Sequence, residues 1–273
     1  MEFNLFHYKK NSKLFLKCSN RYVCMKSYKL IASAFLAALA FILQVSNDVI
    51  GIPTGFGMTI DLAAVPVMLA LFVFGAEYAM LTLMALGAII LVSAPTGAVG
   101  AVMKVGATLP MVLVAHYAGR AKNALDFIGL SAATLLGVVA LFYLSTQAFM
   151  LNSYLGGIIP IGVLLGLAYL TTKDRGSGDL SGLRIAAYAL ALAVLLRGAV
   201  ATVANIYFAG PVFFHMSADE FISFLDSLDV PLLGKGAGWF VIFFWNALQG
   251  AVEFGVAWVL AFRFGLAKRY GDE

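Results

Sequence analysis

The stretch TGFGMTIDLAAVPVMLALFVFGAEYAMLTLMALGAIILVSAPTGAVGAVMKVGATLPMVLVAHYAGR, residues 54–120, decides the fold. It contains apolar runs that are separated only by the polar pair Glu77-Tyr78 and by an Ala-Pro-Thr-Gly break. A helix that crosses a bilayer needs about 20 apolar residues, because lipid offers no hydrogen-bond partner to a bare peptide group. We therefore predict three closely packed membrane crossings in this stretch.

Asp61, Glu77 and Lys104 are the charged residues that precede Arg120 in this stretch. Asp61 opens the first run and Glu77 lies in the turn after it, and water reaches both positions if they are helix ends. Lys104 lies about six residues inside the third run, at a depth of ~9 Å. Its ammonium group must therefore pair, reach the interface or line a polar cavity. An Asp61–Lys104 ion pair is one way to satisfy it.

The composition of the whole chain is that of an integral membrane protein of the all-α class. Its 273 residues are 62% hydrophobic and 12% charged, about half the charged share of an average soluble domain. The net charge of +4 does not indicate a nucleic-acid partner, because the basic residues lie at the ends of apolar runs. We interpret these residues as topology signals that mark the cytoplasmic side of the plasma membrane.

The apolar runs predict about eight spans with both termini in the cytoplasm. Residues 1–28 form a basic arm, in which Met25 is an alternative start, and residues 29–273 form a single polytopic domain. Residues 127–172 contain two of these apolar runs and are predicted to form a transmembrane hairpin. Between the last two spans, the pattern over residues 218–228 predicts a short amphipathic helix on the outer surface.

Two charged residues fall inside the last two predicted spans. Arg197 and Glu253 lie at depths of ~20 Å and ~15 Å from the inner face by helical rise. Opposite charges at similar depth favour a structural ion pair that locks the two helices together, because unpaired charges in lipid are costly. The alternative to a structural ion pair is a role of these two residues in proton coupling.

A second polar set falls near one level in the outer half of the predicted bundle and predicts a wet pocket. Its amides lie three residues apart on one helical face, and amides offer donors and acceptors together, which suits a flat heterocycle. Aromatic residues nearby, among them Phe243 and Trp245, are available for stacking, although such residues more often face lipid or core. The candidate substrate-binding residues are Asp61, Lys104, Asn205, Tyr207, Asn246 and Gln249.

Motifs for enzyme chemistry are missing from the sequence. It has no complete phosphate-binding loop, no His-Glu-x-x-His pattern and no arrangement of nucleophile and base. Cys18 and Cys24 match no zinc-binding spacing. We expect neither an enzyme nor a bound metal or cofactor.

Four segments carry a resemblance to a known family: GMTIDLAAVPVMLALFVFG, APTGAVGAVMK, NIYFAGP and WNALQG. Together they resemble the substrate-binding S component of energy-coupling-factor vitamin transporters, most closely the riboflavin-binding branch. The resemblance covers residues 29–120 and 183–265. Asn205 and Pro211 keep the family's six-residue interval, and Asn246 and Gly250 keep theirs, whereas Gln249 stands where the family has Lys.

The resemblance implies a six-span bundle, to which residues 127–172 would be an addition. It implies a site for riboflavin, as a transported ligand, in the outer half of the late helices. It also implies that Ala34 and Ala38 dock a transmembrane coupling subunit driven by two ATPase subunits. The alternatives are the same fold with another vitamin or a modified base as ligand, and a stand-alone proton-coupled transporter that uses Arg197 and Glu253.

Overall fold

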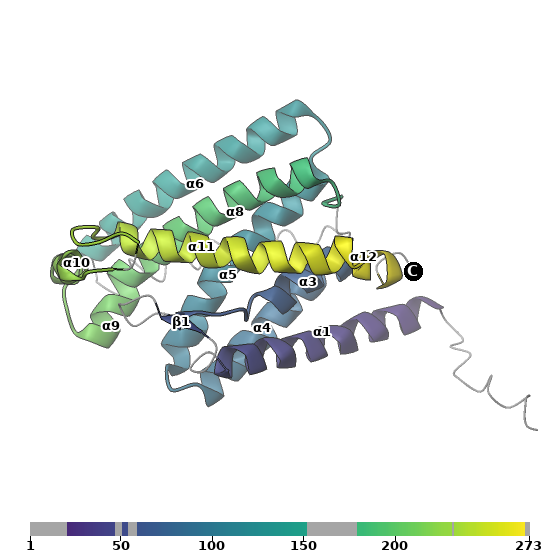
Figure 1. Cartoon of the computed structure of the whole chain (residues 1–273), viewed down its shortest axis with the longest axis horizontal. Coiled ribbons are helices and arrows are strands. Elements are labelled where there is room, and N and C mark those ends of the chain that lie inside the picture. Colours follow the sequence, from purple (N-terminus) through teal and green to yellow (C-terminus); the bar gives the residue numbers. More distant parts are fainter. Residues whose placement is uncertain (1–20, 47–50, 54–58, 152–178, 231, 271–273) are drawn as a thin grey trace, which may run out of the picture.

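The computed structural model describes residues 21–46, 51–53, 59–151, 179–230 and 232–270. Within these ranges the chain is a bundle of helices with one small β-hairpin (Figure 1). Six helices are long and apolar enough to cross a membrane, which is the character of a multi-pass membrane protein. Their apolar segments are Ser27–Val45, Ala76–Ser93, Gly97–Arg120, Ala124–Leu144, Leu183–Phe214 and Phe240–Arg263.

The first half of the bundle is built from α1 (Arg21–Val45), α4 (Ala76–Ser93) and α5 (Gly97–Arg120), with α4 packed between the other two. Helix α1 begins inside the predicted basic arm rather than after it, and residues 1–20 lie outside the described residues. Helix α5 contributes an almost continuous buried segment to the main apolar core and also packs along α8.

The second apolar run does not form a helix of spanning length. Strands β1 (Ile52–Pro53) and β2 (Thr59–Ile60) pair as an antiparallel hairpin, and α3 (Val65–Phe74) follows after a short non-helical segment. Ten residues make a helix of only ~15 Å. Pro66 lies in the first turn, where a missing N–H is tolerated, and Gly75 ends the helix with φ 98°, a conformation that glycine adopts without a Cβ clash. The prediction of three full crossings in residues 54–120 is therefore wrong for the first of them.

The second half contains α6 (Ala124–Leu151), α8 (Leu183–Ala204) and α11 (Phe240–Trp258), and α8 lies between α6 and α11. The first half of the predicted 127–172 hairpin is thus helical, while residues 152–178 lie outside the described residues. Within the described residues, the predicted spans correspond to the six long helices named above and the short α3.

A π-helical turn, η1 (Asn205–Ala209), joins α8 to α9 (Gly210–Phe214). Helix α10 (Ala218–Ser227) confirms the predicted amphipathic helix, and it buries Phe221 and Leu225. Ser217 and Glu220 cap its first turn reciprocally, which satisfies two otherwise free N–H groups.

The two ends of the bundle differ in charge. At one end the chain carries Arg120, Arg184 and, in the π-helical turn η2 (Val259–Arg263) and α12 (Leu266–Tyr270), further cations. We call this the basic end, and it lies at the right of Figure 1. The opposite end, where α10 exposes Asp219 and Glu220, is the acidic end.

Candidate functional site

Asp61 and Lys104 form an ion pair in the interior of the bundle. Lys104 Nζ lies 2.5 Å from Asp61 Oδ1, and the two side chains are only 10% and 8% exposed. The same carboxylate oxygen accepts a hydrogen bond of 2.8 Å from the Ala63 N–H, an interaction that shapes the turn before α3. The sequence predicts that water reaches Asp61 at a helix end, and this prediction is wrong because the side chain is buried. The short α3 lets the preceding segment enter the bundle.

Arg197 and Glu253 form a second ion pair, which joins α8 to α11. Arg197 Nη1 lies 2.7 Å from Glu253 Oε2, and the two side chains are 1% and 0% exposed. The same nitrogen contacts Met111 Sδ of α5 at 3.0 Å. A charge so deeply withdrawn from water is tolerated only when it is paired and hydrogen-bonded. The structure thus contains the Arg197–Glu253 ion pair that the similar predicted depths of the two residues indicate.

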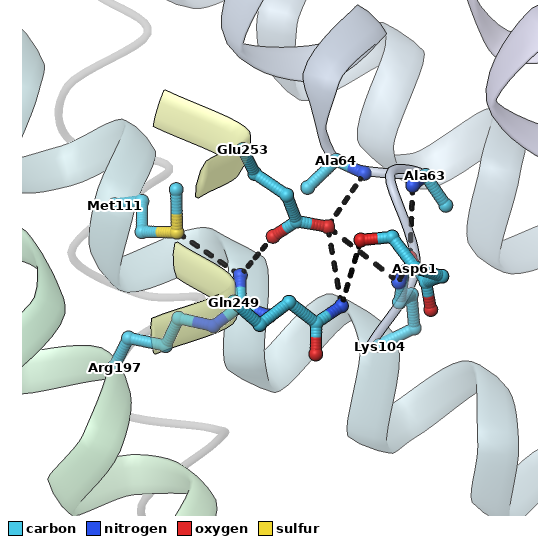
Figure 2. A network of polar contacts seen from close by, with 8 residues as sticks. All are labelled: Asp61, Ala63, Ala64, Lys104, Met111, Arg197, Gln249 and Glu253. Atoms are coloured by element: carbon cyan, nitrogen blue, oxygen red, sulfur yellow. Dashed lines mark hydrogen bonds and ion pairs between the residues drawn. The ribbon is translucent and has the colours of Figure 1, made fainter. Parts of the chain in front are cut away.

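The two ion pairs belong to one network (Figure 2). Glu253 Oε1 accepts a hydrogen bond of 3.1 Å from the Ala64 N–H and lies 4.0 Å from Lys104 Nζ. Gln249 Nε2 lies 3.3 Å from both Glu253 Oε1 and the Asp61 carbonyl oxygen. We call Asp61, Lys104, Arg197 and Glu253 the four-charge network, and its formal charges sum to zero.

The local sequence explains how the network is positioned. On α11, Gln249 and Glu253 are four residues apart and therefore point to the same side of the helix. On α5, Lys104 and Met111 are seven residues apart and also share a face. The non-helical residues that precede α3 supply the free N–H groups of Ala63 and Ala64. This non-helical segment is thus held by the side chains of two helices, α5 and α11.

The remaining predicted ligand residues lie closer to the acidic end. Asn246 is on α11, one turn before Gln249, is 2% exposed and donates through Nδ2 to the Ile242 carbonyl oxygen at 2.9 Å. Asn205 opens η1 and donates to the Ala201 carbonyl oxygen at 2.8 Å. Tyr207 packs against a second apolar cluster that includes Trp245 and the buried residues of α10. The structure brings Asp61, Lys104 and Gln249 into contact and places Asn205 and Tyr207 on a separate turn.

The sequence does not predict that the two ion pairs join into one network. The contact between Gln249 and Asp61 spans 188 residues of chain, so no local spacing encodes it. The available signal was the position of Gln249 one turn from Glu253, which places an amide beside the carboxylate. Met111 and the Ala63 and Ala64 N–H groups carry no sequence signal of their own.

The predicted docking residues lie on the outside of α1. Ala34 and Ala38 are exposed, whereas Ser33, Ala37 and Ala40 turn toward the rest of the bundle. The small residues of α1 are therefore divided between a face used within the chain and a face that is open.

Within the described residues, no cluster of three or more His, Cys, Asp or Glu side chains is arranged to hold a metal ion. A comparison of the chain with models of known protein families, with curated proteins and with solved structures finds no match. The class that the structure defines is a multi-pass, mainly helical membrane protein with a buried network of charges.

Proposed function

We propose that the chain is the substrate-binding subunit of an energy-coupling-factor-type importer in the plasma membrane. In this proposal it captures riboflavin or a related flavin at the acidic end and carries it inward by reorientation, driven by a separate ATPase module. The observation that carries the proposal is the contact of Gln249 with both Asp61 and Glu253, where an unwound segment enters the bundle.

Transport proteins commonly place their substrate sites where a membrane helix is discontinuous, because an unwound backbone exposes N–H and C=O groups to a ligand. The segment between β2 and α3 is non-helical backbone that leads into the short α3, and its Ala63 and Ala64 N–H groups face the carboxylates of the network. Ionisable side chains inside an apolar bundle are costly, so their presence favours a functional role.

The ligand would lie on the acidic side of the four-charge network. Asn246 and Gln249 line this side of α11, and their amides match a flavin's imide and ring nitrogens in donors and acceptors. Trp245 is 4% exposed, and its Nε1 has no hydrogen-bond partner among the described residues. Its indole N–H is therefore available to a ligand carbonyl. Lys104 would contact the ligand's polar edge, and Asn205 and Tyr207 would line the outer rim.

The exposed face of α1 supports the proposed partner. Ala34 and Ala38 are four residues apart, and small residues at this spacing let another helix approach closely in lipid. We assign this face to a transmembrane coupling subunit that is driven by two ATPase subunits. Basic flanks at the two chain ends favour cytoplasmic termini, on the side of those ATPases.

Titration of the purified protein with riboflavin tests the proposal. Binding is expected to quench flavin fluorescence at submicromolar ligand. A thermal-shift screen of other water-soluble vitamins separates a flavin ligand from another vitamin or a modified base. Stabilisation by another vitamin, with no response to any flavin, would reassign the ligand and keep the fold.

A stand-alone proton-coupled transporter is the second candidate, and one observation favours it. Glu253 is fully buried between Arg197 and Lys104, so its carboxylate is placed to exchange a proton during a transport cycle. Uptake in cells that lack any coupling ATPase supports this candidate, particularly if Glu253→Gln still folds but abolishes uptake driven by a proton gradient. Uptake only in the presence of the ATPase module supports the importer subunit.

A further inference from the structure

A hollow of about 200 Å³ lies at the basic end, where the segment before α8 meets η2 and α12. Its polar lining comes from Ser181, Arg263 and Lys268, and its apolar lining includes Ala261, Phe262 and Ala267. None of these residues belongs to the four-charge network, so the hollow is a separate feature of the molecule.

The walls of the hollow are fixed by contacts between distant parts of the chain. Trp258 Nε1 donates to the Leu180 carbonyl oxygen at 2.8 Å, which ties α11 to the segment before α8. The Asp179 N–H donates to the Gly119 carbonyl oxygen at 2.8 Å, which ties the same segment to the end of α5. Ser181 is thereby held opposite η2.

The charge of the hollow is positive. Among the lining residues that the structure describes, two are cations and none is a carboxylate. The nearby Asp179 carboxylate accepts hydrogen bonds from the Ser181 N–H at 3.0 Å and from its hydroxyl at 2.6 Å. Arg263 lies over the Trp258 ring, with its guanidinium carbon 5.1 Å from the ring centroid. This contact restricts the side chain of one cation, while Lys268 is exposed.

We propose that this hollow binds the phosphate-bearing headgroup of an anionic phospholipid. Arg263 and Lys268 supply charge-assisted donors for the phosphate. Phe262 and the two alanines supply an apolar wall. The glycerol and first acyl carbons of a lipid would cover this wall, whereas a free phosphate would leave it uncovered. The hollow also lies at the end of a helix of spanning length, and basic pockets between membrane helices are suited to such headgroups.

Lipid binding to the purified full chain in detergent, measured by native mass spectrometry, tests this assignment. Phosphatidylglycerol and phosphatidylcholine with the same acyl chains are titrated separately, and their dissociation constants are compared. Because each cation near an anionic headgroup contributes about fivefold in affinity, the wild type is expected to prefer phosphatidylglycerol by more than tenfold. The double variant Arg263→Gln/Lys268→Gln is expected to lose most of this preference.

A matched control removes the same charge at the same end, outside the hollow. The double variant Lys122→Gln/Arg269→Gln changes two exposed cations that do not line it. It is expected to keep the preference of the wild type. An equal loss in both double variants would overturn the site in favour of diffuse attraction.

Two further arms complete the test. If the first double variant does not fold, Lys268→Glu alone is expected to lower the preference at least fivefold, and Arg269→Glu is expected not to. Inorganic phosphate is added as a competitor at the lipid's own concentration and at a hundredfold excess. Displacement of phosphatidylglycerol at equal concentration would reassign the site to a free phosphate and overturn the proposal, whereas retention of the lipid supports it.

Discussion

Arg197 on α8 and Glu253 on α11 are joined by an ion pair of 2.7 Å from which water is excluded, since the two side chains are 1% and 0% exposed. Removing one partner leaves the other charge buried and uncompensated, which typically costs about 3–5 kcal/mol. We therefore expect Glu253→Gln and Arg197→Met each to lower the unfolding temperature of the detergent-solubilised protein by many degrees.

The double variant Arg197→Met/Glu253→Gln is expected to recover part of this loss, because neither charge is then left alone. Glu77→Gln is the matched control, since Glu77 lies at the first turn of α4 and is partly exposed. Its effect is expected to be below about 1 kcal/mol. A Glu253→Gln variant as stable as the control would show that the pair does not hold α8 to α11.

Gly250 is the position at which Arg197 passes α11. A Cβ atom added there would lie 2.8 Å from Arg197 Cδ and 3.3 Å from Met111 Sδ. We expect Gly250→Ala to destabilise the protein by about 1–3 kcal/mol, because the core cannot absorb the extra methyl group without moving Arg197. Thermal unfolding in detergent measures the effect.

Gly255, on the same helix, is the control for this substitution. A Cβ atom there meets nothing within 4 Å, so Gly255→Ala is expected to be neutral or to stabilise by up to about 1 kcal/mol. Equal effects of the two substitutions would contradict the close crossing of α8 and α11.

Asp61 holds the segment before α3 through Lys104 and the Ala63 N–H. We expect Asp61→Asn to weaken both contacts and to leave Lys104 with Glu253 as its nearest charged neighbour. Amide hydrogen exchange in a peptide that covers residues 59–64 is expected to accelerate at least tenfold. Asp219→Asn, at an exposed position of α10, should leave this peptide unchanged. Unaltered exchange in Asp61→Asn would show that other contacts hold the segment.

Tyr188 fastens α6 to α8. Its hydroxyl donates to the Phe127 carbonyl oxygen at 2.5 Å and lies 2.7 Å from Ser131 Oγ. Tyr188→Phe is expected to cost about 1–2 kcal/mol, because it leaves a partly buried carbonyl without this donor. Tyr143→Phe makes the same change at an exposed site on α6 and is expected to have no effect on thermal unfolding. Equal stability of the two variants would remove this role from Tyr188.

The first turn of α10 is expected to depend on pH. Hydrogen bonds from the Ser217 N–H and from its hydroxyl lower the pKa of Glu220 below its ordinary value. Since the folded-state pKa is the lower one, the stabilisation is complete above the unfolded-state pKa. It is lost as the pH falls through the folded-state pKa.

Hydrogen exchange of α10, compared at neutral and acidic pH after correction for the intrinsic rate, measures this loss. Protection is expected to fall on acidification in the wild type. In Glu220→Gln it is expected to be lower at neutral pH and to change little with pH. Equal pH dependence in the two proteins would show that Glu220 does not control the capping box.

Hydropathy and charge spacing predicted the features that depend on short stretches of the sequence. The apolar runs located the long helices, the pattern after residue 217 predicted α10, and similar depths predicted the pairing of Arg197 with Glu253. The position of Lys104 inside its run required a partner, and Asp61 supplies it.

The short length of α3 and the burial of Asp61 inside the bundle were not predictable in this way. A run of apolar residues has the same hydropathy whether it spans the bundle or fills half of it, and the turn at Gly75 is a backbone conformation that hydropathy does not detect. The joining of the two ion pairs then follows from where the segment before α3 enters the bundle, which is a tertiary property.

Riboflavin titration of purified wild type and of Lys104→Met/Gln249→Leu tests the central claim most directly, that the polar interior of this bundle serves a transported ligand. Glu77→Gln is the control, because Glu77 lies in the first turn of α4 and belongs neither to the four-charge network nor to the proposed ligand site. The account predicts submicromolar quenching of flavin fluorescence by the wild type and the control, and a loss of at least a hundredfold in affinity in the double variant. Flavin binding that is absent from the wild type, or equal in all three proteins, would contradict it.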